Sequence, residues 1–250
     1  MISGLTKMRN KNLLSIAKEV IKLEKDSLIK LHSSIGKSFE KIIKTILNCK
    51  NGKVVISGVG KSGIIGKKWS ATLSSTGTPS FFLDASNASH GDLGQITSND
   101  IIILISLSGQ SDELKNIIQF ASRNSSIKLI GITSKKDSIL YKNSDVKFLL
   151  PNVKEAGPGS FVPTSSTTVQ MALGDAIAIT CMRYKKFSKL DFKKFHPSGS
   201  LSVKLKTVED LMLVGRKIPF VNENVSMRTA IKNIAKKGLG ALVVKNKKNK

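Results

Sequence analysis

Five short apolar runs, separated by segments with helical periodicity, constrain the fold of this chain more than any other feature. The runs are residues 54–56, 81–83, 101–105, 129–133 and 146–150. Strands that are apolar at nearly every position are buried on both faces, which is typical of a parallel sheet covered by helices. The pattern therefore predicts an α/β protein built on a doubly wound, five-stranded parallel sheet.

The segments on either side of this region complete the expected organisation. Residues 11–50 carry apolar side chains at helical spacing with lysines between them, which predicts two amphipathic N-terminal helices, the second near residues 38–47. Residues 164–184 are expected to form one long apolar helix. Residues 208–250 are too few to bury much of a core alone. Within them we expect, in order, a short apolar run at 218–221, a helix at 226–237 and a strand at 241–244.

Hydropathy and cysteine content bear on where such a chain resides. No apolar run approaches the roughly 18 residues that a membrane-spanning helix requires. Residues 1–7 carry a positive charge but no apolar core follows them, so no secretory signal is predicted. The lone cysteines Cys49 and Cys181 fit a reducing compartment. We therefore expect a cytoplasmic protein that has no membrane partner.

The net charge of +24 raises the question of a nucleic-acid partner. Only five of the 41 basic residues are arginine, whereas specific recognition of phosphates and bases favours the planar guanidinium group. The lysines are also spread along the chain. A surplus of Lys, Asn, Ile and Ser with little Arg is what AT-rich codons produce. We therefore attribute the charge to coding bias and expect no nucleic-acid partner.

The loop after the first strand carries a glycine pattern that suits phosphate binding. In a doubly wound sheet, ligands bind at the carboxyl ends of the strands, so function is expected in the loops after the runs that end at residues 56, 83, 105 and 150. Gly58, Gly60 and Gly63 match G-x-G-x-x-G between a strand and a helix. Asp84, 21 residues beyond Gly63, stands where a dinucleotide site places its ribose-binding acid. A P-loop is excluded because its first glycine would have to be residue 55, which is valine. Three interpretations of this glycine loop stay open: a plain strand-to-helix turn, a dinucleotide site, and a site for one compact phosphate.

Two further loops are rich in hydroxyl groups at predicted helix starts. Residues 106–113 follow the third strand, and residues 163–168 begin the long helix. A single hydroxyl at a helix start is often only an N-cap. Two such clusters together with the glycine loop predict a cradle for one compact phosphate. The candidate phosphate-binding residues are Gly60, Ser62, Ser106, Ser108, Ser111, Thr164, Ser165, Ser166 and Thr167.

Few ionisable side chains stand in these loops, and they are the candidates for acid–base chemistry. They are Lys61, His90, Glu113, Glu155 and His196. Neither cysteine is near a histidine in the sequence, and no pair of His and Cys has helical spacing, so we expect no metal site. The G-x-S-x-G motif of a nucleophilic serine is absent from the sequence, and no cofactor is expected.

A series of short motifs, taken in order, resembles the D-arabinose 5-phosphate isomerase family. The motifs lie at residues 58–63, 75–82, 90–94, 106–109, 154–156, 163–168 and 196–199. The resemblance implies a sugar isomerase (SIS) domain, here residues 1–205, and then a pair of CBS motifs, of which residues 206–250 would be a truncated first one. It also implies interconversion of D-ribulose 5-phosphate and D-arabinose 5-phosphate, supply of the Kdo sugar of lipopolysaccharide, and a homotetramer.

The resemblance also implies roles for the ionisable residues. Aldose–ketose isomerisation moves a proton between C1 and C2 through a cis-enediol, and a carboxylate suits that transfer. Glu155 is the expected base, with Glu113 as its alternative. Lys61 or a histidine would stabilise charge on the carbonyl oxygen. His196, or else His90, would transfer the proton that opens the aldose ring.

This chain departs from the family pattern at two positions. Members often have Asn and Glu where the loop after the third strand has Leu107 and Gln110. The hydroxyl groups of that loop are unaffected. Three other functions compete with the isomerase: a related SIS isomerase acting on another sugar phosphate, a non-catalytic sugar-phosphate sensor, and an NAD-dependent oxidoreductase that would use the glycine loop and Asp84.

Overall fold

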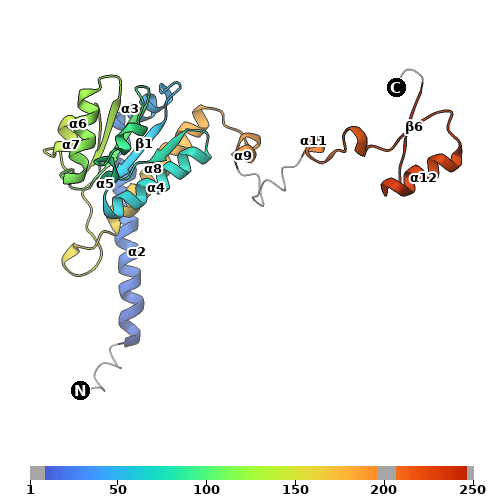
Figure 1. The fold of residues 1–250 in the computed structure, drawn as a ribbon. Coiled ribbons are helices and arrows are strands. Elements are labelled where there is room, and N and C mark those ends of the chain that lie inside the picture. The colour runs from blue at the N-terminus through green and yellow to red at the C-terminus, as the bar shows by residue number, and fades with distance from the viewer. Residues whose placement is uncertain (1–8, 196–206, 247–250) are drawn as a thin grey trace. The chain divides into compact units, whose positions relative to one another are not determined.

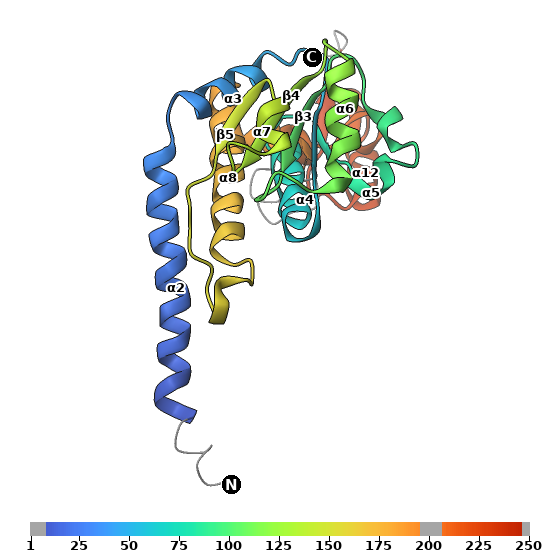
Figure 2. The same ribbon diagram turned by 90° about the vertical axis from the view of Figure 1, so that its left-hand side faces the viewer.

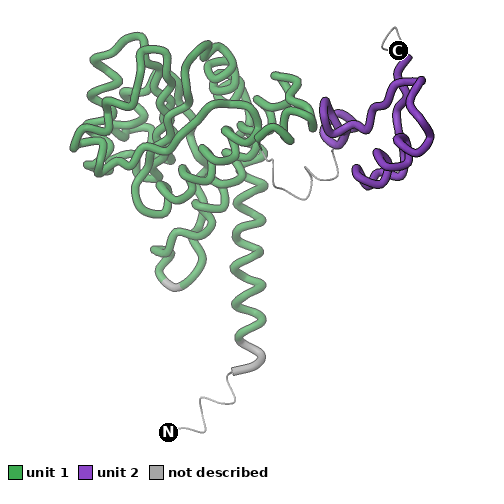
Figure 3. The backbone as a smooth tube through the Cα atoms, turned by 45° about the vertical axis from the view of Figure 1, so that its right-hand side comes forward, with its two compact units in different colours: residues 1–195 green, residues 196–250 purple. Residues whose placement is uncertain are grey.

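The computed structural model describes residues 9–195 and 207–246. The chain divides into two compact units, residues 1–195 and residues 196–250 (Figure 3). Each unit is described by itself.

The first unit is built on a parallel sheet. Its strands are β1 (Val54–Gly58), β2 (Ser80–Phe82), β3 (Ile101–Ile105), β4 (Lys128–Thr133) and β5 (Val146–Leu149). They are ordered β2-β1-β3-β4-β5, and every neighbouring pair is parallel. The predicted five-stranded, doubly wound sheet is therefore confirmed.

Helices cover both faces of this sheet (Figures 1 and 2). The longer ones are α2 (Arg9–Ser34), α3 (Lys37–Leu47), α4 (Gly60–Ser75), α6 (Lys115–Arg123) and α8 (Ser165–Tyr184). The shorter ones are α5 (Ala85–Ala88), α7 (Ile139–Asn143), α9 (Lys189–Phe195) and the 3-10 turns η1 (Asp92–Gln95), η2 (Asp112–Leu114) and η3 (Pro158–Ser160). The two expected N-terminal helices are α2 and α3. Helix α2 packs against α8 and runs on past the sheet.

The side chains of the central strand alternate between two hydrophobic cores. Ile101, Ile103 and Ile105 of β3 pack with residues of α3, α4 and α8, whereas Ile102 and Leu104 pack with residues of α5, α6 and α7. All five side chains are buried. Full burial of each such side chain stabilises the fold by roughly 1.5–3 kcal/mol. Because side chains point alternately to the two faces of a strand and both faces are covered here, the strand has no polar face.

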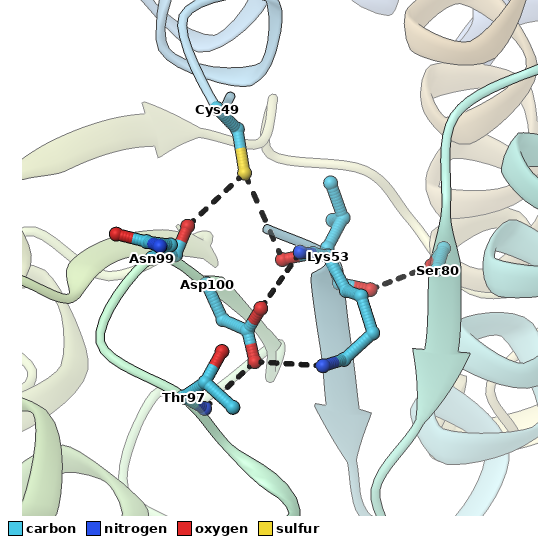
Figure 4. A network of polar contacts seen from close by, with 7 residues as sticks. Cys49, Lys53, Ser80, Thr97, Asn99 and Asp100 are labelled. Atoms are coloured by element: carbon cyan, nitrogen blue, oxygen red, sulfur yellow. Dashed lines mark hydrogen bonds and ion pairs between the residues drawn. The ribbon is translucent and has the colours of Figure 1, made fainter. Parts of the chain in front are cut away.

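A buried carboxylate holds the amino-terminal edge of the sheet together (Figure 4). Asp100, just before β3, accepts hydrogen bonds from the backbone N–H of Lys53 (2.7 Å) and of Thr97 (2.8 Å). Its side chain is fully buried and also lies 3.4 Å from the Lys53 ammonium group. The thiol of Cys49 donates to the carbonyl of Asn99 in the same network (3.3 Å). Burial raises the pKa of Asp100, but the hydrogen bonds from Thr97 and Lys53 outweigh it, and the pKa lies below its ordinary value.

Replacing Asp100 by asparagine is expected to lower the free energy of unfolding by about 1–3 kcal/mol, because an amide cannot accept both N–H groups and one buried donor loses its partner. A carboxyl with a lowered pKa contributes its full stability above its unfolded pKa and loses that contribution as the pH falls through its folded pKa. Urea titrations should therefore separate wild type from Asp100→Asn at neutral pH, and the difference should shrink as the pH falls below the ordinary range of an aspartate. The exposed Asp137→Asn is the control, and equal costs for the two variants at neutral pH would contradict the prediction.

The second unit is a small strand–helix–strand arrangement. It contains α11 (Val208–Leu211), the 3-10 turn η4 (Gly215–Lys217), β6 (Phe220–Asn222), α12 (Met227–Lys237) and β7 (Val243–Lys245). Strands β6 and β7 pair in parallel. Ser226 caps the start of α12, and Gly238 ends it in the left-handed conformation. Val221 and Ala230 are buried, and most of the described apolar side chains of this unit are exposed, as expected for so short a segment.

The described helices include none that is long and apolar enough to cross a membrane.

Candidate active site

The strand order places the candidate residues at one edge of the sheet. The chain passes from β1 to β2 on one side and then to β3 on the other, so the direction of winding reverses between β1 and β3. Loops that leave the carboxyl ends of strands at such a reversal form the usual ligand crevice of this architecture. The loops after β1, β3, β4 and β5 all leave the sheet at the edge where its parallel strands end, which we call the carboxyl edge.

The glycines after β1 allow helix α4 to begin directly against the strand. Gly60 has a φ of +57°, which a residue with a side chain rarely adopts. A Cβ added at Gly63 would lie 2.6 Å from the carbonyl oxygen of Gly58, so the first turn of α4 approaches β1 closely. Lys61 and Ser62 stand in that first turn, Lys61 exposed and Ser62 half-buried. The turn therefore presents unpaired backbone N–H groups at the edge where an anion is expected.

The serine loop after β3 is organised by its own hydroxyl groups. The Oγ of Ser106 accepts a hydrogen bond from the backbone N–H of Gly109 (3.0 Å) and lies 3.2 Å from the Oγ of Ser111. The Oγ of Ser108 accepts from the N–H of Gln110 (3.3 Å). These contacts bring Ser106 and Ser111 together.

Replacing Gly109 by alanine is expected to displace this loop. Gly109 has a φ of +63°, and an added Cβ would lie 2.3 Å from the Oγ of Ser138. The strained conformation alone costs about 1–2 kcal/mol. We expect binding of inorganic phosphate, measured by calorimetry, to weaken about tenfold. Gly94→Ala is the matched control, because a Cβ there meets nothing within 4 Å. Equal phosphate affinity in the two variants would count against the loop as the anion site.

Glu155 is held at the start of α8 through one of its carboxylate oxygens. Its Oε2 accepts hydrogen bonds from the backbone N–H of Thr164 (2.8 Å), the backbone N–H of Ser166 (3.1 Å) and the hydroxyl of Thr164 (3.2 Å). Only 9% of the residue is exposed. Burial raises the pKa of this carboxyl, but the hydrogen bonds from Ser166 and Thr164 together outweigh it, so the pKa lies below its ordinary value.

The hydroxyl cluster of α8 directs most of its hydrogen bonds into the protein. Besides its contacts with Glu155, the Oγ1 of Thr164 accepts from the N–H of Ala156 (2.8 Å), and Thr167 donates to the carbonyl of Thr164 (2.7 Å). Ser165 and Ser166 are buried, and the Oγ of Ser165 has no hydrogen-bond partner among the described residues. In this structure the cluster supports Glu155, and its contact with a phosphate stays a prediction.

A cavity of about 290 Å³ lies over the carboxyl ends of β3, β4 and β5. It brings two of the predicted residues, Ser108 and Glu155, together. Its lining also includes Leu107, Ser134, Lys135 and Asn152. Ser134 and Lys135 belong to the loop after β4, which the sequence interpretation had not included among the functional loops. No motif marks Ser134 and Lys135, so the sequence feature that could have identified them is their position directly after an apolar strand.

The remaining candidates do not line this cavity. Lys61 and Glu113 are exposed, Glu113 in η2 directly after the serine loop. His90 is exposed after α5. Asp84, the ribose-binding acid of the dinucleotide interpretation, caps α5 by accepting from the N–H groups of Ser86 and Asn87. His196 lies outside the described residues.

Size alone would not have identified this site. The described part of the chain has a larger cavity, about 560 Å³, at the opposite, amino-terminal edge of the sheet, where it is lined by residues such as Cys49, Asp100 and Lys128. No group of three or more His, Cys, Asp and Glu side chains in the described ranges is placed to hold a metal ion.

Comparisons with known proteins agree with this architecture. The SIS domain family model matches residues 46–180. The arabinose 5-phosphate isomerase KdsD of Francisella tularensis is 46% identical over 231 residues, which cover 91% of this chain and 70% of the relative. KdsD of Escherichia coli K12 is 41% identical over 228 residues, 91% of this chain and 69% of the relative.

A solved structure shares the fold. The Escherichia coli CFT073 protein c3406, solved in complex with arabinose 5-phosphate, superposes with a TM-score of 0.73 at 37% identity. The match covers 76% of this chain and 100% of that one. Together with the two KdsD relatives, this shows that the chain belongs to the arabinose 5-phosphate isomerase family of SIS-domain proteins.

Proposed function

We propose that the protein is an aldose–ketose isomerase that interconverts D-ribulose 5-phosphate and D-arabinose 5-phosphate. The observation that carries the proposal is the cavity at the carboxyl edge, where the buried carboxylate of Glu155 and the serine loop meet. A serine loop suits a phosphate, and a fixed carboxylate suits proton transfer at a carbon next to a carbonyl. The relatives named arabinose 5-phosphate isomerase support this choice of sugar. Its product would supply Kdo synthesis, as the resemblance implies.

The mechanism assigns the two ends of the substrate to different groups. The hydroxyls of Ser106, Ser108 and Ser111 hold the phosphate, and backbone N–H groups at the start of α4 contribute further donors. Glu155 takes a proton from C1 of the ketose, the electron pair of that C–H bond forms the C1–C2 double bond of the enediol, and the former carbonyl oxygen at C2 gains a proton. The C1 hydroxyl then loses its proton as the aldehyde forms, and the proton on Glu155, or one exchanged with solvent, is delivered to C2. The Oε2 of Glu155 already accepts hydrogen bonds from Thr164 and Ser166 at the start of α8, so its other oxygen, Oε1, carries this proton.

Lys61 and the two histidines act on oxygen atoms. Lys61 or His90 donates to the carbonyl oxygen as negative charge builds on it. A ring must be opened only for the aldose, because the 5-phosphate leaves the 2-ketose no hydroxyl with which to close a five-membered ring. His196 is the group we assign to that proton transfer. Glu113 is the alternative base.

A solvent-exchange assay tests the proposal. Purified protein is incubated with D-ribulose 5-phosphate in deuterated water, and deuterium at C2 of D-arabinose 5-phosphate is followed by NMR. We expect labelled aldose, since a base that exchanges its proton with solvent returns deuterium. Absence of aldose product across neutral pH would overturn the proposal. Faster conversion of a hexose or heptose phosphate in parallel reactions would instead assign the chain to a related SIS isomerase.

The organisation of the chain belongs to the same proposal. We propose that residues 1–205 are the SIS isomerase domain and that residues 206–250 are part of a first CBS motif, on the basis of the strand–helix–strand order of the second unit. We further propose a cytoplasmic homotetramer. Sedimentation equilibrium of the full chain tests the tetramer, and a mass of about 27 kDa, that of one chain of 27.1 kDa, would contradict it.

A further inference from the structure

The cavity at the carboxyl edge carries two opposite charges. Among the described residues that line it, Glu155 is the one carboxylate and Lys135 is the one ammonium group. Glu155 comes from the loop after β5, and Lys135 comes from the loop after β4. The Lys135 side chain makes no ion pair or hydrogen bond with another described residue. Other surface lysines of this unit are paired, such as Lys68 with Asp175. A free ammonium group in a ligand cavity is available to an anion.

The backbone of Lys135 is anchored. Its N–H donates to the Oγ1 of Thr133 (3.3 Å), and its carbonyl accepts from the hydroxyl of Ser138 (2.7 Å) and from the backbone N–H of Ser138 (3.3 Å). The position of its Cα therefore does not depend on a flexible loop, although the side chain itself is exposed. An anchored backbone lowers the entropy lost when the ammonium group meets a ligand.

The loop after β4 is also tied to the serine loop after β3. The carbonyl oxygen of Leu107 accepts hydrogen bonds from the Oγ of Ser134 (2.8 Å), the N–H of Ser134 (3.1 Å) and the Oγ1 of Thr133 (3.1 Å). The carbonyl of Gly109 accepts from the N–H of Leu140 (3.1 Å). The two loops thus form one hydrogen-bonded unit, which keeps Lys135 on the same cavity as Ser108.

We propose that Lys135 binds the phosphate group of the substrate and supplies the positive charge that the serine hydroxyls lack. The inference rests on the proposed function, because it concerns the same cavity and its sugar phosphate. A sugar phosphate carries between one and two negative charges at neutral pH, since its second pKa is about 6. Hydroxyl and N–H donors provide hydrogen bonds without net charge, whereas an ammonium group adds a compact charge with three donors.

The motifs single out a different lysine. Lys61, in the glycine loop, is the lysine that they mark, and its expected role is at the carbonyl oxygen. It stands on α4 at the end of β1, is exposed and does not line the cavity. Lys136, the neighbour of Lys135, is exposed in the same loop and does not line the cavity either, which makes it a matched control.

The test compares three variants in the steady-state conversion of D-arabinose 5-phosphate. Lys135→Met is expected to raise KM about tenfold or more, which corresponds to about 1.4 kcal/mol, while kcat changes less than about threefold. Lys135→Arg keeps the charge and should recover most of the affinity. Lys136→Met should have the wild-type KM. Rising ionic strength should raise KM for wild type more than for Lys135→Met.

A second readout separates this inference from the proposed function. The dissociation constant of inorganic phosphate is measured by calorimetry for the same proteins, which requires no turnover. If wild type forms no aldose but Lys135→Met alone weakens phosphate binding about tenfold, the phosphate role stands and the isomerase proposal fails. If wild type is active and Lys135→Met and Lys136→Met have equal KM and equal phosphate affinity, the inference about Lys135 is wrong and the isomerase proposal stands.

Discussion

Replacement of Glu155 by glutamine is expected to lower kcat for the isomerisation at least ~100-fold with little change in KM, the effect of removing a general base. Glutamine retains a carbonyl oxygen, which can still accept the hydrogen bonds that Thr164 and Ser166 donate to Oε2. It has no group that can take a proton from carbon. The variant therefore removes the chemistry and preserves much of the link to α8.

The comparison variant is Glu113→Gln, because Glu113 is the alternative base. Glu113 is exposed in η2, and the same substitution there is expected to leave kcat within about threefold of wild type if Glu155 is the base. Urea unfolding of both variants shows whether a loss of activity reflects loss of structure. Near-normal turnover in Glu155→Gln, combined with a ~100-fold loss in Glu113→Gln, would transfer the role of base to Glu113.

The pH dependence distinguishes a base from a purely structural carboxylate. The pKa of Glu155 lies below its ordinary value, because the hydrogen bonds from Ser166 and Thr164 outweigh the effect of burial. A base must be ionised, so kcat, which reports groups in the enzyme–substrate complex, should stay level on the acid side until the pH falls below the ordinary range of a glutamate. The residual activity of Glu155→Gln should lack that acid limb. An unchanged acid limb in the variant would show that another group titrates there.

Replacement of Trp69 by alanine is expected to lower the free energy of unfolding of the first unit by about 3–5 kcal/mol. The indole is fully buried between α4 and α8, and its Nε1–H donates to the carbonyl of Gln170 (2.9 Å). Its loss leaves a cavity in the core and removes this link between the two helices. Circular dichroism during urea unfolding measures the effect, since Trp69 is the one tryptophan of the sequence and fluorescence would be lost with it.

A double-mutant cycle makes this prediction sharper. A Cβ added at Gly174 would lie 2.1 Å from the Nε1 of Trp69, so Gly174→Ala should destabilise the wild type by about 1–3 kcal/mol. In the Trp69→Ala background the same change should cost much less, because the ring it meets is gone. Met171→Ala, on the exposed side of α8, is the control. Additive costs for Trp69 and Gly174 would contradict direct packing between them.

The elements of the first unit were predictable because their signals are local. The apolar run at 101–105 and the helical spacing of apolar residues in 11–50 depend only on residues close to one another in the chain. The glycine loop was predictable for the same reason, since a close strand-to-helix turn needs Gly60 and Gly63 whatever surrounds it. The role of Lys135 was not predictable from the sequence, because a lysine after a strand resembles any other surface lysine in this chain.

Local sequence patterns specify which segments become strands and helices, where the glycine and serine loops lie, and that these loops leave the same edge of a parallel sheet. Long-range packing sets the order β2-β1-β3-β4-β5, which brings the loop after β4 against the serine loop and places Lys135 on the same cavity as Ser108. The same packing lets Thr164 and Ser166 hold Glu155 across nine and eleven residues of chain. Periodicity and turn chemistry act between neighbours in sequence, whereas these contacts form only when the sheet and α8 have packed.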